Sequence, residues 1–169
     1  EGQKKNIAGA RPLSRSGLEL LLKGLRATIA RLQGPNPAQT VWGDYAGNNS
    51  YRQGESAAKA AFVADFCSNL RPGTLWDIGC NTGDCSEVAL RSGAVKVVGF
   101  DSDIGALETA IVRADAGKLD FLPLCMDITN PSPSQGWRQD ERKGLGQRAG
   151  ADAILALALL HHMVIGSNI

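Results

Sequence analysis

A short loop with two glycines, placed between a predicted strand and a predicted helix, constrains this chain most. The loop is Asp77-Ile78-Gly79-Cys80-Asn81-Thr82-Gly83-Asp84. Because Gly79 and Gly83 have no side chains, the backbone of the turn can approach a ligand closely. A nicotinamide-binding loop would have the pattern G-x-G-x-x-G, but Asp84 occupies the place of its third glycine. A carboxylate there repels a pyrophosphate and favours a ligand that carries an amino group.

Strand-like and helix-like segments alternate around this loop. Strands are predicted over 74–78, 95–100 and 121–127, helices over 84–92 and 104–116, and a central strand covered on both faces over the apolar run 153–160. Such alternation implies parallel strands with right-handed crossovers. The polar segment 130–150 is rich in Pro, Ser and Gly, which indicates a loop or a loop plus a short helix. We therefore predict an α/β fold, a Rossmann-like doubly wound parallel sheet.

Two helices are predicted before the first strand. The first follows a stripe of apolar residues at helical spacing and ends before Gly34 and Pro35; the stripe is Leu18, Leu21, Leu22, Leu25, Ile29 and Leu32. The second runs from about Glu55 to Arg71. We expect residues 1–54 to form a helical and loop segment that covers a cofactor or acceptor site, and 55–169 to form the sheet domain. The chain lacks an initiator Met and stops soon after the fourth strand, so we expect a fragment.

Charge and cysteine content exclude several classes of protein. The net charge is +1, so nucleic acid binding is not indicated, although it is not excluded. Nine basic and four acidic residues stand among the first sixty, so an acidic partner could dock on that first third, although a solvated basic face is the simpler interpretation. No run approaches the length of a membrane span and no signal peptide opens the chain, so we expect a cytoplasmic protein. The four cysteines have neither zinc-ligand nor disulfide spacing. We expect reduced, mostly buried thiols and no metal.

Acidic residues stand at the predicted ends of the next two strands. Asp101 lies 18 residues beyond Gly83 and could accept hydrogen bonds from both hydroxyls of a ribose. Asp103 is the better candidate for the cap of the following helix. Asp127 could accept from an exocyclic adenine amine, although a turn-forming role before Thr129-Asn130-Pro131 is the alternative.

The glycine loop, Asp101, Asp127 and the segment ending Leu159-Leu160-His161-His162 resemble the ordered motifs of the class I S-adenosylmethionine (SAM)-dependent methyltransferases. Segments 42–51, 130–137 and 155–162 resemble more narrowly the bacterial NoeA-related branch of nodulation proteins. The resemblance implies SAM as cofactor and an unidentified methyl acceptor. Cofactor contacts are expected from Asp77, Gly79, Cys80, Asn81, Gly83, Asp101, Ser102, Asp127, Ile128, Leu157 and Lys59. Gly83→Val is expected to abolish SAM binding in a domain that still folds.

Candidates for acceptor chemistry lie beyond the fourth strand and in a loop upstream. His161 and His162 could act as a general base or position the acceptor, although both could simply close a strand. Neighbours in an extended segment point opposite ways, so one of them, His161 for preference, would line the pocket. An aromatic- and amide-rich loop could fold over the site through Tyr45, Asn49, Tyr51 and Arg52. Lys59 could reach the SAM carboxylate or pair with Glu55 instead.

Three functions remain open from the sequence. The leading hypothesis is a SAM-dependent methyltransferase. A non-catalytic SAM-binding module with a regulatory or scaffold role would use the same fold. A nicotinamide-dependent oxidoreductase is disfavoured by Asp84.

Overall fold

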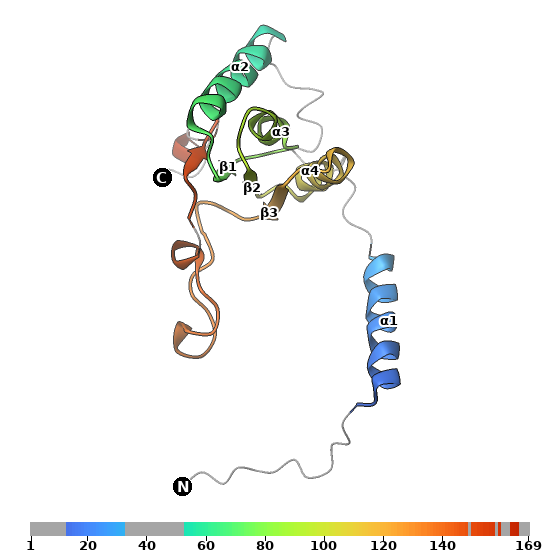
Figure 1. The fold of residues 1–169 in the computed structure, drawn as a ribbon. Coiled ribbons are helices and arrows are strands. Elements are labelled where there is room, and N and C mark those ends of the chain that lie inside the picture. Colours follow the sequence, from blue (N-terminus) through green and yellow to red (C-terminus); the bar gives the residue numbers. More distant parts are fainter. Residues whose placement is uncertain (1–12, 33–52, 149, 158, 160–162, 166–169) are drawn as a thin grey trace. The chain divides into compact units, whose positions relative to one another are not determined.

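The structure, a computed structural model, describes residues 13–32, 53–148, 150–157, 159 and 163–165 (Figure 1). The chain divides into two units, Glu1–Gly34 and Pro35–Ile169, and each is described by itself. The first unit contains one described helix, α1 (Arg15–Arg31), as the leucine spacing predicts. Ser14 caps it, because its Oγ accepts a hydrogen bond from the Gly17 N–H at 3.1 Å. No residue of α1 is buried.

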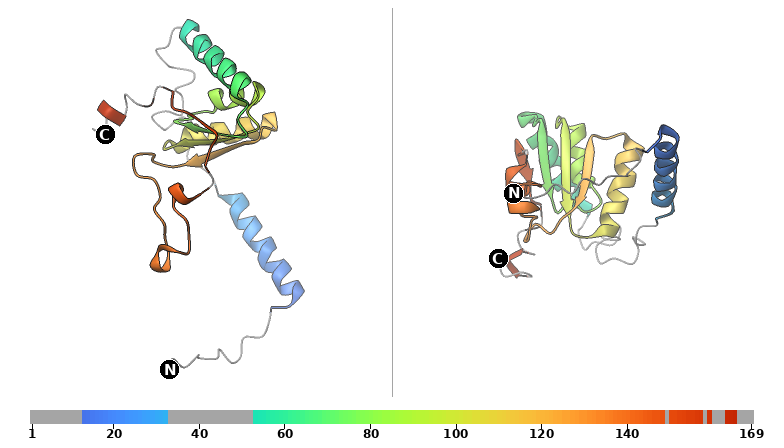
Figure 2. Two further views of the ribbon diagram at one scale, coloured as in Figure 1. Left: turned by 60° about the vertical axis from the view of Figure 1, so that its left-hand side comes forward. Right: turned by 90° about the horizontal axis from the view of Figure 1, so that it is seen from below.

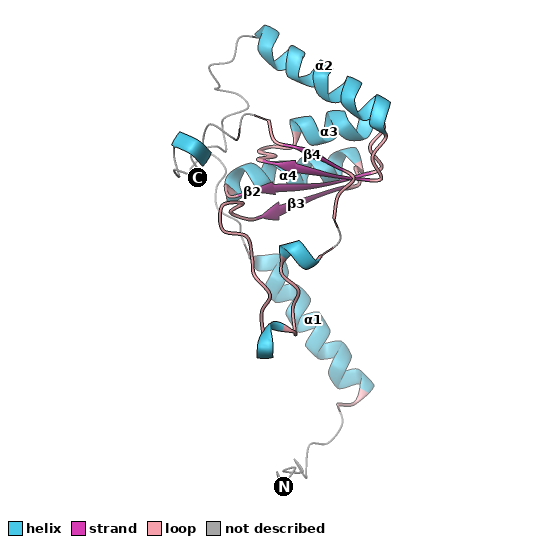
Figure 3. Cartoon of the chain, turned by 90° about the vertical axis from the view of Figure 1, so that its left-hand side faces the viewer, coloured by secondary structure: helices cyan, strands magenta, loops and turns pink. Residues whose placement is uncertain are grey.

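The described residues of the second unit form a four-stranded parallel sheet with three helices (Figure 3). Its elements in chain order are α2 (Gln53–Leu70), β1 (Thr74–Ile78), α3 (Asp84–Arg91), β2 (Lys96–Asp101), α4 (Ile104–Gly117), β3 (Phe121–Cys125), the 3-10 turns η2 (Trp137–Gln139) and η3 (Leu145–Gln147), and β4 (Ala153–Leu155). The strand order is β3-β2-β1-β4. This order confirms the predicted Rossmann-like α/β fold with helices before the first strand.

The core lies between the sheet and the helices. Both crossovers, through α3 and through α4, step in the same direction across the sheet, so their right-handedness places the two helices on one face. Leu75 pairs with Val97 and with Ala153, and Val97 pairs with Phe121, so these four side chains form one row facing the helices. All four are buried. Burial of this row is the main apolar contribution to the stability of the unit.

The other face of the sheet is apolar but more exposed. Its central row is Trp76, Val98, Leu122 and Ile154, of which Leu122 is 52% and Ile154 is 54% exposed. No described helix of the second unit covers this face, and the right-hand view of Figure 2 shows the sheet from below. The prediction of a strand over 153–160 covered on both faces is therefore wrong in extent and in burial. β4 ends at Leu155, alternates buried and exposed residues, and pairs only with β1 among the described strands.

The connection from β3 to β4 extends away from the sheet as an irregular hairpin (Figure 1). Gln135 and Arg142 form an isolated antiparallel bridge, and η2 and η3 are its only described helical turns. Trp137 near the tip is 78% exposed. The predicted loop with a short helix over 130–150 is confirmed.

Candidate cofactor-binding site

The carboxyl ends of β1, β2 and β3 meet at one edge of the sheet. Asp101 ends β2 and is in register with Cys125, the last residue of β3. The N–H of Met126 donates to the backbone oxygen of Asp101 at 2.8 Å. The glycine loop, Asp101 and Asp127 therefore gather where open α/β sheets bind ligands, outside the carboxyl ends of their strands.

The glycine loop is held by its own backbone hydrogen bonds. The N–H groups of Gly79 and Cys80 both donate to the Phe100 oxygen, at 2.8 and 3.1 Å, and the Gly83 N–H donates to the Cys80 oxygen at 2.9 Å. The Asn81 N–H donates to Asp101 Oδ2 at 2.8 Å, and the Thr82 N–H donates to Asn81 Oδ1 at 2.8 Å. Every backbone N–H from Gly79 to Gly83 thus has an acceptor within the protein.

Two glycines are required for close packing against one aromatic ring. Gly83 has φ +82°, and a Cβ there would lie 2.5 Å from Cε1 of Phe121. A Cβ on Gly99 would lie 2.7 Å from Cε2 of the same ring. Phe121 is buried, so the ring cannot simply turn away. Gly83→Val would therefore disturb the core as well as the loop, which corrects the expectation that this variant folds normally.

Asp101 connects the loop to the sheet. Its Oδ2 accepts from Asn81 as above, and its Oδ1 accepts from the Asp103 N–H at 2.9 Å. Each carboxylate oxygen has two lone pairs, so both can still accept from the hydroxyls of a ribose. Asp103 is the cap of α4, as predicted, because its Oδ1 accepts from the Ala106 N–H at 3.0 Å.

Asp77 lies beneath the loop. It is 2% exposed, and its Oδ2 accepts from the Ser86 hydroxyl at 2.6 Å. Burial raises the pKa of Asp77 to about 6; the Ser86 hydrogen bond opposes this effect and the charge of Asp101 adds to it. Direct contact with a ligand ammonium group would require a more exposed carboxylate. The geometry instead suits Asp77 to hold the first turn of α3 against β1.

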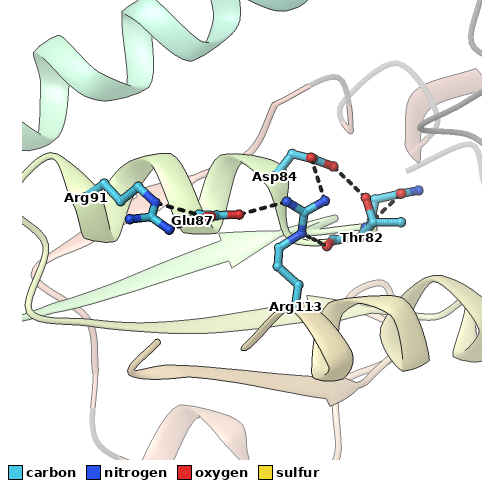
Figure 4. Close-up of polar contacts among 6 residues, drawn as sticks. Thr82, Asp84, Glu87, Arg91 and Arg113 are labelled. Carbon is cyan, nitrogen blue, oxygen red and sulfur yellow. Dashed lines mark hydrogen bonds and ion pairs between the residues drawn. The ribbon is translucent and has the colours of Figure 1, made fainter. Parts of the chain in front are cut away.

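Asp84 belongs to a cluster of charged side chains around the second half of the loop (Figure 4). Its Oδ2 accepts from Thr82 Oγ1 at 2.5 Å, and its Oδ1 accepts from Arg113 Nη2 at 2.7 Å. Arg113 also donates to the Thr82 backbone oxygen and to Glu87. Its hydrogen bond to Glu87 is the largest cause that lowers the pKa of that carboxyl, followed by the one from Arg91.

The sequence did not indicate Arg113, Ser86 or Phe121 as part of the site. Arg113 lies in the middle of α4, where an arginine is usually a solvated surface residue, and no local pattern pairs it with the loop. A β-strand phenylalanine is ordinary core, and only the glycines at 83 and 99 hint that a ring must lie against them.

Asp127 forms the turn that the sequence offered as an alternative. Its Oδ1 accepts from the Thr129 N–H at 2.9 Å and from the Thr129 hydroxyl at 2.7 Å. These hydrogen bonds lower the pKa of Asp127, that of the Thr129 side chain most. The carboxylate is exposed at the same edge as Asp101.

The remaining cofactor candidates differ in exposure. Cys80 is buried, and burial raises the pKa of its thiol, which disfavours the reactive thiolate; the same cause raises the pKa of Cys85 to about 11. The charge of Lys59, a residue of α2, is a smaller cause that lowers the pKa of Cys85. Ser102 is exposed, and Ile128 and Leu157 are half-buried. Of the thiols expected to be mostly buried, Cys67 and Cys80 are buried, Cys85 is half-buried and Cys125 is exposed.

Several predicted site residues lie outside the described residues: Tyr45, Asn49, Tyr51, Arg52, His161 and His162. Among the described residues, no group of three or more His, Cys, Asp or Glu side chains could hold a metal ion. Within the same residues, no helix is both long enough and apolar enough to cross a membrane.

Fold and site together define the class: a Rossmann-like α/β domain, with a glycine loop after β1 and an acidic residue at the end of β2. No family model matches the chain. Over 160 residues, 95% of its length, the chain is 44% identical to nodulation protein NoeA of Rhizobium meliloti (strain 1021). This confirms the resemblance to the NoeA-related branch. The chain spans 34% of the length of that relative.

Two of the solved structures that are similar to part of this chain are called methyltransferases. A candidate RNA methyltransferase from Pyrococcus horikoshii is 25% identical, with 63% of this chain and 52% of that one covered and a TM-score of 0.41. A SAM-dependent methyltransferase from Agrobacterium tumefaciens is 22% identical, with 43% and 24% covered and a TM-score of 0.39.

We predict that Gly83→Ala destabilises the unit. The added Cβ would meet Phe121, and its φ of +82° disfavours a side chain. Overpacking and left-handed strain together should lower the free energy of unfolding by about 2–4 kcal/mol. Urea unfolding measures this loss. Gly146→Ala is the control, because a Cβ there has nothing within 4 Å; equal stability of the two variants would contradict the packing.

We predict that Asp77 makes stability fall as pH rises from about 4 to 6. Its pKa of about 6 when folded lies above the ordinary 3.8, so in that window the folded state holds the extra proton. This difference in pKa corresponds to a loss of roughly 3 kcal/mol in the free energy of unfolding across the window. Asp77→Asn should remove that fall, measured by urea unfolding at several pH values. Asp115→Asn, at an exposed position of α4, should keep the wild-type slope.

Proposed function

We propose that this chain carries the SAM-binding half of a SAM-dependent methyltransferase. The observation that supports this most is the internal pairing of the loop: each N–H from Gly79 to Gly83 donates to the protein itself. A pyrophosphate is recognised by unpaired backbone N–H groups at such a loop. A loop that offers none over these five residues suits a ligand without phosphate.

The donor set at the sheet edge suits the parts of SAM. Asp101 would accept from the ribose hydroxyls, and Asp127 with Ile128 would contact the adenine. Gly79, Cys80, Asn81 and Gly83 would contact the methionine part through their backbone. For Asp77, burial favours support of the loop over direct contact with the ammonium group. Lys59 would pair with the SAM carboxylate, with Ser102 and Leu157 at the rim of the site.

SAM would supply a methyl group on a sulfonium, and transfer requires chiefly that the acceptor be aligned with it. We propose His161, and secondarily His162, as the group that positions the acceptor or takes its proton. Tyr45, Asn49, Tyr51 and Arg52 would close over the site as part of the segment 1–54, with the SAM-binding domain at 55–169. These residues do not specify the chemical class of the methyl acceptor.

Two other functions make different predictions. A SAM-binding regulatory module would bind the cofactor but methylate no acceptor in the full-length protein. A nicotinamide-dependent oxidoreductase would bind a dinucleotide, for which the paired loop N–H groups offer no donors.

We predict that Asp101→Ala weakens binding of S-adenosylhomocysteine about ten- to hundredfold, as measured by titration calorimetry. A 2′-deoxy analogue should bind more weakly than the parent compound to the wild type. It should lose little further affinity in the variant, because its missing hydroxyl and the missing carboxylate belong to one interaction. Full additivity of the two losses would contradict the ribose contact.

Asp103→Ala is the matched control. It removes the cap of α4 and should cost about 1 kcal/mol of stability while leaving affinity within about twofold. Absence of any SAM or S-adenosylhomocysteine binding by the wild-type chain would overturn the proposed function itself.

A further inference from the structure

The guanidinium of Arg113 joins α4 to the glycine loop and to α3 (Figure 4). Its Nε donates to the Thr82 backbone oxygen at 2.8 Å, Nη2 donates to Asp84 Oδ1 at 2.7 Å and Nη1 donates to Glu87 Oε2 at 2.8 Å. All three nitrogens are used. The side chain is 29% exposed, so these contacts are partly shielded from water.

The contact to Thr82 is the one that reaches the loop backbone. This oxygen belongs to the peptide between Thr82 and Gly83, immediately before the left-handed turn at Gly83. Thr82 is 2% exposed, and its hydroxyl donates to the same Asp84 that Arg113 binds. Arg113, Thr82 and Asp84 therefore form a closed set of hydrogen bonds around one peptide of the loop.

Asp101 and Arg113 hold different halves of the loop. Asp101 binds the Asn81 N–H from the end of β2, and Arg113 binds the Thr82 oxygen from the middle of α4. A loop held at two successive residues from two separate elements has little freedom to change its backbone before a ligand arrives.

Arg91 is a neighbouring arginine that binds the same carboxylate, Glu87, but does not bind the Thr82 oxygen. It binds Glu87 through Nε at 2.9 Å and Nη2 at 2.8 Å, within α3, and its side chain is 64% exposed. Among the described residues, Arg91 makes no hydrogen bond to the loop. The two arginines share one carboxylate, and only Arg113 continues to Thr82 and Asp84.

We infer that Arg113 is a positioning residue, which holds the glycine loop in the conformation that receives the cofactor. The inference rests on the proposed function for the identity of that cofactor. A lysine could pair with one carboxylate as a point charge, but it lacks the planar fork that reaches a carbonyl and two carboxylates together. Arginine is therefore specifically required at 113.

The test compares Arg113→Met, Arg113→Lys and Arg91→Met in the full chain. Titration calorimetry with S-adenosylhomocysteine should show affinity about 10- to 100-fold weaker for Arg113→Met, an intermediate loss for Arg113→Lys and a change below about twofold for Arg91→Met. Urea unfolding of each variant gives its global stability, so that a loss of affinity through unfolding is recognised.

Amide hydrogen exchange without ligand tests the positioning role independently of the cofactor. The Asn81, Thr82 and Gly83 amides should exchange at least about tenfold faster in Arg113→Met than in Arg91→Met, while the Val97 amide in β2 stays protected. If Arg113→Met does not fold, Arg113→Lys supplies a comparison in the same direction with a smaller effect, because one ammonium group cannot reach the Thr82 oxygen and both carboxylates together.

The outcomes separate the two proposals. Loop exchange and affinity equal to those of Arg91→Met would overturn the role of Arg113. A wild-type chain that binds no S-adenosylhomocysteine, yet shows faster loop exchange in the Arg113 variants, would overturn the proposed cofactor and leave the positioning of the loop supported.

Discussion

The site depends on the packing of one aromatic ring against two glycines. Phe121, at the start of β3, occupies the space that side chains at Gly83 and Gly99 would need. This brings the loop after β1, the middle of β2 and the first residue of β3 into contact, and it does so inside the core. Both positions require glycine because a side chain would collide with the Phe121 ring, and Gly83 requires it also for its left-handed backbone conformation. A loop placed in this way lies close to Asp101, so that the Asn81 N–H can donate a hydrogen bond to the Asp101 carboxylate.

Much of the fold could be predicted from the sequence because its signals are local. The strand 74–78 and the cap at Asp103 follow from apolar patterning and from the chemistry of a single side chain. The end of β4 could not be predicted in this way. An apolar run has the same composition whether both of its faces are covered or only one, and Ile154 is exposed because no described helix of the second unit lies over its face of the sheet.

The sequence could predict a site residue only where its local position marks it. Asp77 and Asp101 each stand at the end of a predicted strand, and a parallel sheet brings the ends of its strands together. Arg113 is 29 residues from Asp84, and only the crossover through β2 and α4 makes them neighbours. The contact between Arg113 and Asp84 also bears on the expectation that Asp84 repels a pyrophosphate. Its carboxylate is bonded to Arg113 and Thr82, so repulsion of a pyrophosphate by a free negative charge no longer applies, and the pairing of the loop N–H groups takes its place.

Asp101 and Arg113 would then influence affinity by different routes. A side chain that contacts the ligand adds interaction energy, whereas one that only orders the loop reduces the entropy that binding must remove. Arg113 acts by the second route alone, because all three of its nitrogens bond within the protein. Asp101 would act by both, since the oxygen that accepts from Asn81 can also accept from a ribose hydroxyl. Loss of Asp101 therefore combines a missing contact with a looser loop, and Arg113 is the position at which the second effect can be observed by itself.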